Sequence, residues 1–141
     1  MERLSAIYKI LVSAIGGIVG FFFGGWTVPL KILVSLSLVD YSTGLIAGGV
    51  EKNLSSKVGF RGIAKKVMMF ALVATGNLVD IAIGKGHVFR DAVIFFYMGN
   101  EILSILENAG RIGLPYPEQL RSAIEVLKGK NEEKKIREES R

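Results

Sequence analysis

Three carboxylates stand inside otherwise uncharged runs of this sequence: Asp40, Asp80 and Glu101. A carboxylate in the middle of a lipid bilayer costs about 2.5 to 3.5 kcal/mol on insertion scales, so it must face protein or water, or be protonated. Ionisable groups at that depth typically line a water-filled path or a proton route. The other interpretation is that these acids pair with Asn, Ser, Thr or Tyr side chains inside a packed bundle.

Polar side chains accompany the acids at helical spacing. Asn77 precedes Asp80 by about one turn, and a polar stripe over residues 100–108 opposes apolar residues on the other side of the same segment. We therefore expect one polar surface, either lining a pore or facing the inside of the bundle. Its candidate members are Asp40, Asn77, Asp80, Asn100, Glu101, Ser104, Glu107 and Asn108.

The residue types do not favour catalysis or the binding of a metal, a cofactor or a nucleic acid. The chain has no cysteine, so thiolate metal sites and thiol nucleophiles are excluded. Its one histidine, His87, lies in a short loop without a nucleophile-elbow motif, and Gly84-Lys85 is followed by glycine rather than Ser or Thr. We expect no enzyme, no metal and no cofactor. Nucleic-acid binding is not expected either, because no basic face with interleaved aromatics is visible.

The acids are carried by segments long enough to cross a membrane. Half of the 141 residues are hydrophobic, and the 21 uncharged residues between Lys9 and Lys31 make about 30 Å of helix, the thickness of a bilayer's hydrocarbon core. The sequence predicts an all-α, polytopic membrane protein with three to four transmembrane helices. The expected spans are residues 10–30, 32–50, 67–84 and 92–109.

The fourth span and the C-terminal region are more polar. The run over residues 92–106 is interrupted by polar side chains, so an interfacial or re-entrant helix is the alternative to a fourth crossing. Residues 1–109 form the expected transmembrane bundle, and residues 110–141 form a charged cytoplasmic tail. A short amphipathic helix is expected to begin at Pro117, with Leu120, Ile124 and Leu127 on one face.

Glycines recur every four residues in the first two spans. Glycine faces of this kind let two helices approach closely in lipid, which favours their association. The sequence therefore predicts packing between the first and second spans and clustering of copies into a homo-oligomer. The predicted packing residues are Gly16, Gly20, Gly24, Gly44 and Gly48.

A basic segment over residues 51–66 fixes the expected orientation. Short loops rich in Lys and Arg stay on the cytoplasmic side of a bilayer. With this segment inside and four crossings, both termini are cytoplasmic. The topology-setting residues are Lys52, Lys57, Arg61, Lys65 and Lys66.

Five segments of the chain resemble the toxin-secretion/phage-lysis holins. They are Gly24-Gly25-Trp26; Asp40-Tyr41-Ser42-Thr43-Gly44; Leu54-Ser55-Ser56-Lys57 with Gly59-Phe60-Arg61-Gly62-Ile63-Ala64-Lys65-Lys66; Asn100-Glu101-Ile102-Leu103-Ser104-Ile105-Leu106-Glu107-Asn108-Ala109; and Gly113-Leu114-Pro115-Tyr116-Pro117. The resemblance extends from about Gly24 to Leu127. Thr27 departs from it, since the family often has an acid directly after the tryptophan, and no role for such an acid carries over.

The resemblance implies a small lysis protein of the bacterial cytoplasmic membrane. Such holins open lesions that let an endolysin, a peptidoglycan hydrolase, reach the cell wall, and some relatives are tied to toxin release. Direct contact with the endolysin is not implied. Our hypothesis is that glycine faces cluster the copies while the polar surface stays buried, and that opening turns this surface towards water.

Two other functions fit parts of the sequence. A small ion- or proton-coupled transporter or channel subunit fits the intramembrane acids and a partial repeat, in which Leu38-Val39-Asp40 recurs as Leu78-Val79-Asp80 in oppositely directed spans. A membrane scaffold that only anchors its polar tail is the third. The scaffold predicts that Asp40 is dispensable, whereas the other two functions require it.

Overall fold

The computed structural model describes residues 1–84, 86–120, 122, 137 and 139–140. Within these residues the chain is helical and contains no strand, which confirms the all-α prediction. The four helices are α1 (Glu2–Phe23), α2 (Val28–Val50), α3 (Ser56–Ile83) and α4 (Val88–Arg111).

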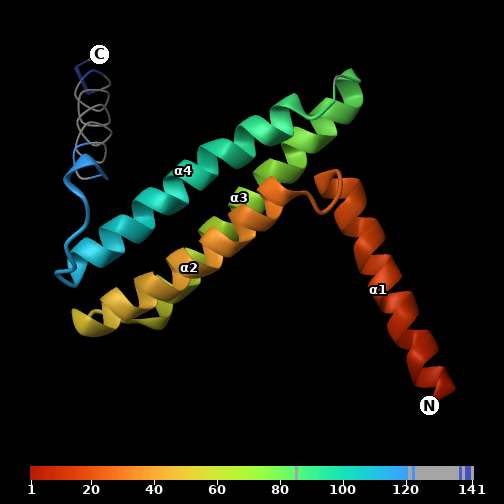
Figure 1. Ribbon diagram of the computed structural model, residues 1–141, viewed down its shortest axis with the longest axis horizontal. Helices are drawn as coiled ribbons and strands as arrows, with labels where there is room; N and C mark the ends of the chain where they lie inside the picture. Colours follow the sequence, from red (N-terminus) through yellow and green to blue (C-terminus); the bar gives the residue numbers. More distant parts are fainter. Residues whose placement is uncertain (85, 121, 123–136, 138, 141) are drawn as a thin grey trace.

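The first helix stands apart from the other three. It ends at Gly24, which adopts a left-handed conformation at φ 72° and caps the helix through a bond from its N–H to the Gly20 carbonyl. Glycine tolerates this conformation without a steric penalty. After the turn the chain leaves in a new direction, so α1 extends away from the bundle (Figure 1) and none of its residues is buried.

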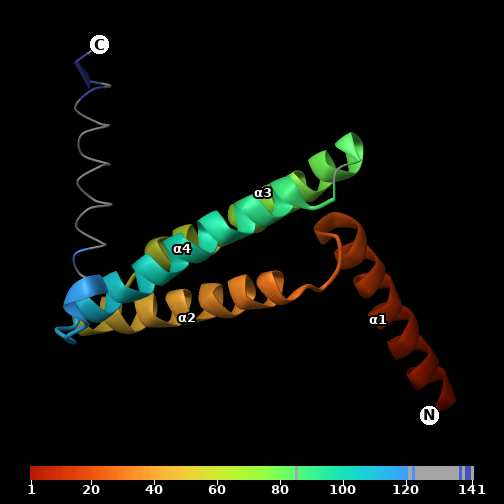
Figure 2. The same ribbon diagram turned by 45° about the horizontal axis from the view of Figure 1, so that its top comes forward.

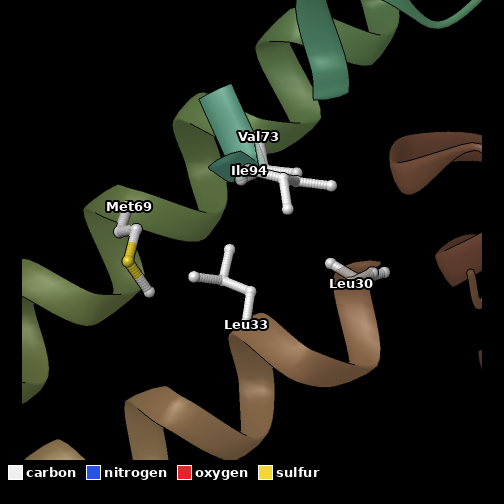
Figure 3. Close-up of a cluster of buried hydrophobic side chains, with 5 residues drawn as sticks. All are labelled: Leu30, Leu33, Met69, Val73 and Ile94. Carbon is white, nitrogen blue, oxygen red and sulfur yellow. The ribbon is translucent and has the colours of Figure 1, made fainter. Parts of the chain in front are cut away.

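The other three helices pack lengthwise, with α2 parallel to α4 and α3 antiparallel to both (Figures 1 and 2). A small apolar core joins them near the end where α2 begins. Its buried side chains come from all three helices and point towards one another (Figure 3). They are Leu30, Leu33, Met69, Val73 and Ile94.

Three helices are long and apolar enough to cross a membrane: α1, α2 and α3. Helix α4 does not reach that apolar content, but it lies along α2 and α3 rather than apart from them (Figure 1). Its buried residues all lie on the side that faces the bundle. By length and composition, three helices could therefore span a membrane, and a crossing by α4 stays a prediction.

The basic segment is mostly helical, which corrects the expectation of a loop over residues 51–66. Only residues 51–55 connect α2 to α3, because Ser55 begins the helix by accepting a hydrogen bond from the Val58 N–H at 3.3 Å. This is a Ser N-cap, and polar residues follow it in the first turns of α3. Lys57, Arg61 and Lys65 thus lie one turn apart along a helix, at a spacing of four residues.

Two further expectations differ from the structure or fall outside it. The first apolar run is divided by the turn at Gly24, so that Trp26 lies between helices and Pro29 lies in the first turn of α2. Most of the C-terminal amphipathic helix, including Ile124 and Leu127, lies outside the described residues.

Candidate functional site

Two of the three intramembrane acids share one lysine. The Lys66 ammonium group donates hydrogen bonds to Asp40 Oδ2 at 2.8 Å and to Glu101 Oε2 at 2.6 Å. Asp40 comes from α2, Lys66 from α3 and Glu101 from α4, so the cluster joins three helices. The side chain of Glu101 is only 10% exposed and that of Asp40 only 14%. We call these residues, together with Asn108, the acid cluster.

Asn108 completes the acid cluster from about two turns nearer the end of α4. Its Nδ2 group lies 3.1 Å from Asp40 Oδ1, 3.2 Å from the Asp40 carbonyl oxygen and 3.0 Å from Thr43 Oγ1. Arg111 in turn donates to Asn108 Oδ1 at 3.2 Å. Polar contacts therefore run without interruption from Arg111 to the buried acids, and linked hydrogen bonds of this kind reinforce one another at low dielectric.

Arg111 also forms an ion pair that closes this end of the bundle. Its guanidinium group contacts Glu51 Oε2 at 2.6 Å and Oε1 at 3.2 Å, and both side chains are partly exposed. This hydrogen bond lowers the pKa of Glu51 below its usual value. Glu51 follows the last residue of α2, so the pair connects the end of α2 to the end of α4.

The acid cluster lies in a partly open groove of about 650 Å³ between α2, α3 and α4. Its lining includes the apolar Met68 and the polar Tyr97, Asn100 and Ser104. Lys65 also lines the groove, and it is exposed to the surroundings. The groove is thus a recess of mixed apolar and charged lining, which extends towards the end of the bundle where α3 begins.

The third acid, Asp80, caps the start of α4. Its Oδ1 accepts a hydrogen bond from the Phe89 N–H at 2.9 Å, and its Oδ2 accepts one from the Arg90 N–H at 2.8 Å. Backbone N–H groups in a first helical turn have no partner within the helix, and the helix dipole favours a negative charge there. Asp80 is 1% exposed, so a buried carboxylate is stabilised by a helix N-terminus.

The opposite arrangement holds the end of α1. The Arg90 Nη1 group donates to the carbonyls of Phe23 and Gly24, each at 3.2 Å, and Asn77 Nδ2 donates to the Phe21 carbonyl at 3.0 Å. A cation near the last carbonyls of a helix matches the negative end of its dipole. We call Asn77, Asp80 and Arg90 the turn cluster, because they join the ends of α1 and α3 to the start of α4.

The turn cluster contains strained and unsatisfied positions. Among the described residues, Asn77 Oδ1 and Thr27 Oγ1 are buried without a hydrogen-bond partner. Each such atom costs about 1 to 3 kcal/mol of desolvation. A Cβ atom at Gly24 would lie 2.5 Å from Asn77 Oδ1, so this turn accepts only glycine. The contacts that hold α1 to the bundle are therefore weaker than the buried Arg90 of α4 alone suggests.

The predicted polar surface is divided between these two clusters. The expectation that Asp40 and Asp80 are buried against one another is wrong, because Asp80 is bonded to the start of α4 whereas Asp40 is bonded to Lys66. Within the stripe on α4, Glu101 and Asn108 are buried and Ser104 is partly buried. Asn100 and Glu107 are exposed, and Asn100 lines the groove.

The predicted glycine contact between the first two spans is also absent within the single chain. Gly44 faces Asn108 of α4 and Gly48 faces Leu54, because α1 turns away from α2. A Cβ atom at Gly16 or Gly20 would meet nothing within 4 Å, so packing by these two residues stays a prediction about other copies.

Three residues at these sites were missed. The sequence pattern predicts Lys66 only as a topology-setting residue, and it singles out neither Arg90 nor Gly76. Gly76 permits the closest approach of α3 and α4, since its Cβ position is 3.1 Å from the backbone of Arg90. A signal existed for Lys66: its position directly before an apolar run puts it within reach of an acid on a neighbouring helix.

A bundle of apolar helices with buried ion pairs, and with a further apolar helix outside the bundle, defines a multi-span membrane protein. The sequence matches the bacteriophage holin family over residues 17–129, which is most of the chain. The chain therefore belongs to the bacteriophage holin family, a family of non-enzymatic membrane proteins.

Relatives occur in several bacteria. An uncharacterised protein of Halalkalibacterium halodurans is 43% identical over 131 residues, which cover 89% of this chain and 97% of that protein. One from Listeria innocua is 42% identical, covering 91% of each chain. A 14.9 kDa protein encoded in the nagH 3' region of Clostridium perfringens is 35% identical, covering 92% of this chain and 99% of its own. No solved structure matches the chain significantly.

Proposed function

We propose that this protein is a holin that accumulates in the bacterial cytoplasmic membrane, assembles into homo-oligomers and opens lesions. The lesions let an endolysin reach the cell wall, or permit release of a toxin or another protein. Membership of the holin family supports this proposal, as do three helices that are long and apolar enough to cross the membrane.

The single observation that carries the proposal is that α1 has no buried residue within the chain. This helix of 22 residues is apolar along most of its length, yet none of its residues is buried within the chain. The positions facing Gly16 and Gly20 are empty. A glycine face on a membrane helix permits close packing against another helix, and only another copy supplies one here.

The acid cluster supplies a surface that can line a lesion. In the closed chain its charges face one another between α2, α3 and α4. When copies reassemble with these helices separated, the same side chains face water. Membrane potential is a suitable trigger, because moving one charge across it involves about 2.3 kcal/mol per 100 mV.

We infer that the end of the bundle carrying Lys57, Arg61 and Lys65 faces the cytoplasm, because basic residues are retained there. With α4 crossing as a fourth span, both termini are cytoplasmic. The absence of native cysteines makes this testable with single-cysteine variants. Ser5→Cys and Ser56→Cys are expected to react with a membrane-impermeant thiol reagent only after the cells are broken, and Gly86→Cys in intact spheroplasts.

The proposal is tested by induced expression in a bacterium while growth and membrane potential are recorded. Cells are expected to lose potential abruptly, and to lyse only when an endolysin without its own export signal is co-expressed. Asp40→Leu is expected to shift or abolish lysis, whereas the exposed Glu118→Leu is the matched control with no effect. Unchanged timing at equal expression would remove Asp40 from the mechanism.

The competing functions give different results in this experiment. A transporter or channel subunit would move one small solute and would not release a folded endolysin. A scaffold would tolerate Asp40→Leu but would fail when residues 131–141 are deleted. Cells that stay alive and fully polarised at high expression would contradict the holin function itself.

A further inference from the structure

We propose that the groove between α3 and α4 binds an anionic phospholipid, with the lipid phosphate at Arg61 and Lys65 and an acyl chain along Met68. This site shares its groove with the acid cluster, but lipid binding by the isolated chain holds whether or not the chain opens lesions. The proposal rests on the shape and lining of the groove, on the place of the basic residues in the bilayer, and on the lack of another partner for them.

The length of α3 puts these basic residues at the membrane surface. Its 28 residues make a helix of about 42 Å, whereas the hydrocarbon core of a bilayer is about 30 Å thick. The surplus of about 12 Å corresponds to roughly eight residues at ~1.5 Å each. Because the polar residues of α3 are concentrated at its N-terminus, we place the surplus at that end. The long side chains of Arg61 and Lys65 then extend towards the headgroups.

From Lys65 inwards, the lining that α3 contributes becomes apolar, which is the order that a lipid requires. Lys65 lines the groove, and Arg61 lies one turn further towards the cytoplasm, outside the lining. Met68, which is 62% exposed, lines it one turn deeper. A phospholipid has the same order along its length, with the phosphate at the surface and the acyl chain below it. Basic recesses between membrane helices on the cytoplasmic side bind anionic headgroups.

The opposite wall, formed by α4, offers hydrogen-bond donors at the same level. Asn100 and Ser104 line the groove. An amide and a hydroxyl can donate to phosphate or glycerol oxygens, which a purely apolar wall cannot do.

The charges leave the groove suited to an anion. Asp40 and Glu101 also line it, but both carboxylates are bonded to Lys66 and only a small fraction of each side chain is exposed. No ion pair involves Arg61 or Lys65 among the residues that the structure describes, so both cations are available for a phosphate. Their charge is complementary to phosphatidylglycerol and to other anionic lipids, and not to a zwitterionic lipid.

The test measures lipids retained by the purified full-length protein. The protein is placed in nanodiscs of equal parts phosphatidylglycerol and phosphatidylcholine, and native mass spectrometry counts the bound lipids. The unaltered protein is expected to retain phosphatidylglycerol selectively. Arg61→Gln with Lys65→Gln is expected to reduce that retention at least about fivefold, the factor for one basic side chain near an anionic surface.

Two comparisons make this result specific. Lys9→Gln with Lys31→Gln removes the same charge from elsewhere on the protein and is expected to leave retention unchanged. Met68→Trp fills the groove without changing the charge, and it is expected to reduce retention as strongly as the double Gln variant. Because Met68 is exposed, this variant keeps the test decisive even when the double variant does not fold.

An equal loss of phosphatidylglycerol retention in the two double Gln variants would mean that basic residues attract the lipid only diffusely. That result would overturn the proposal. Full retention in Met68→Trp would overturn the position of the acyl chain. Because retention is measured on isolated protein, its failure is distinguishable from failure to lyse cells.

Discussion

The acid cluster lies about midway along α2 and α4, the turn cluster lies where α4 begins, and the two stabilise the bundle in different ways. The acid cluster joins side chains of three helices and is balanced by a single lysine, so both of its ion pairs depend on Lys66. The turn cluster joins side chains to helix ends, with Asp80 at the start of α4 and Arg90 at the end of α1. One cluster pairs charges, and the other pairs charges with backbone dipoles.

The difference shows which part of the closed chain is fixed and which part can move. In the acid cluster two carboxylates accept hydrogen bonds from the one ammonium group of Lys66. The side-chain amide of Asn108 also donates to the backbone carbonyl and to the carboxylate of Asp40. In the turn cluster the buried Asn77 Oδ1 lacks a partner, as does Thr27 Oγ1 in the connection between α1 and α2. We therefore expect α1 to separate from the bundle before α2, α3 and α4 separate from one another.

The largest effect is expected from Lys66→Met. This change leaves two buried carboxylates without a cation, and breaking a buried pair costs about 3 to 5 kcal/mol. The free energy of unfolding, measured by SDS titration in mixed micelles, is expected to fall by that amount. The combined variant Asp40→Leu, Lys66→Met and Glu101→Met removes all three charges and is expected to restore stability. An equal loss in the neighbouring Lys65→Met would contradict the special role of Lys66.

Arg90→Met is expected to act on α1 rather than on the bundle. It removes two charged hydrogen bonds to the α1 carbonyls, each of a kind worth about 1.5 to 3 kcal/mol. Spin labels at Ser5→Cys and Leu45→Cys are expected to give a narrow distance distribution by double electron–electron resonance in the unaltered protein. Arg90→Met should broaden it, while Arg3→Met, at the exposed end of α1, should not. A narrow distribution in Arg90→Met would show that α1 is held by other contacts.

Gly76→Ala is expected to separate α3 from the start of α4, beside the turn cluster. The new methyl group lies 3.1 Å from the Arg90 backbone, and such overpacking typically costs about 1 to 3 kcal/mol. The free energy of unfolding measures this cost. Gly99→Ala, in open space on α4, is the control and should be neutral or slightly stabilising. Equal stability of the two variants would mean that α4 can move away without loss.

The smallest effect is expected at the Glu51–Arg111 ion pair. Arg111 lowers the pKa of Glu51, so the pair stabilises the folded chain above the ordinary glutamate pKa and is lost as pH falls through the lowered pKa. Glu51→Gln should therefore be slightly less stable than the unaltered protein at neutral pH and equally stable in acid. A difference that persists in strong acid would show that the effect is not electrostatic.

Much of the architecture was accessible from the sequence, because apolar runs long enough to cross a bilayer have few other uses. The helical character and the membrane location of the protein followed from such runs, and the family resemblance rested on motifs such as Asp40-Tyr41-Ser42-Thr43-Gly44. The start of α3 did not follow, because its first turns are polar and their helicity depends on the Ser55 cap and on packing.

The partners of the acids were harder to predict because they depend on how the helices are placed. Asp40 and Lys66 are 26 residues apart, and only the antiparallel packing of α2 and α3 brings them together. The sequence predicts Asp80 to be an acid within a membrane span. In the structure it lies near the end of α3, where it caps the start of α4. The glycine contact was mispredicted because Gly24 ends α1 and turns it away from α2.

The most direct test of the account is lysis by the combined variant Asp40→Leu, Lys66→Met and Glu101→Met. It is expressed at the level of the unaltered protein, with the endolysin, while membrane potential is recorded. We predict a protein that inserts into the membrane and remains folded but neither depolarises the cells nor releases the endolysin, because the lesion has lost its polar lining. Lysis at the time seen for the unaltered protein would contradict that role for the acid cluster.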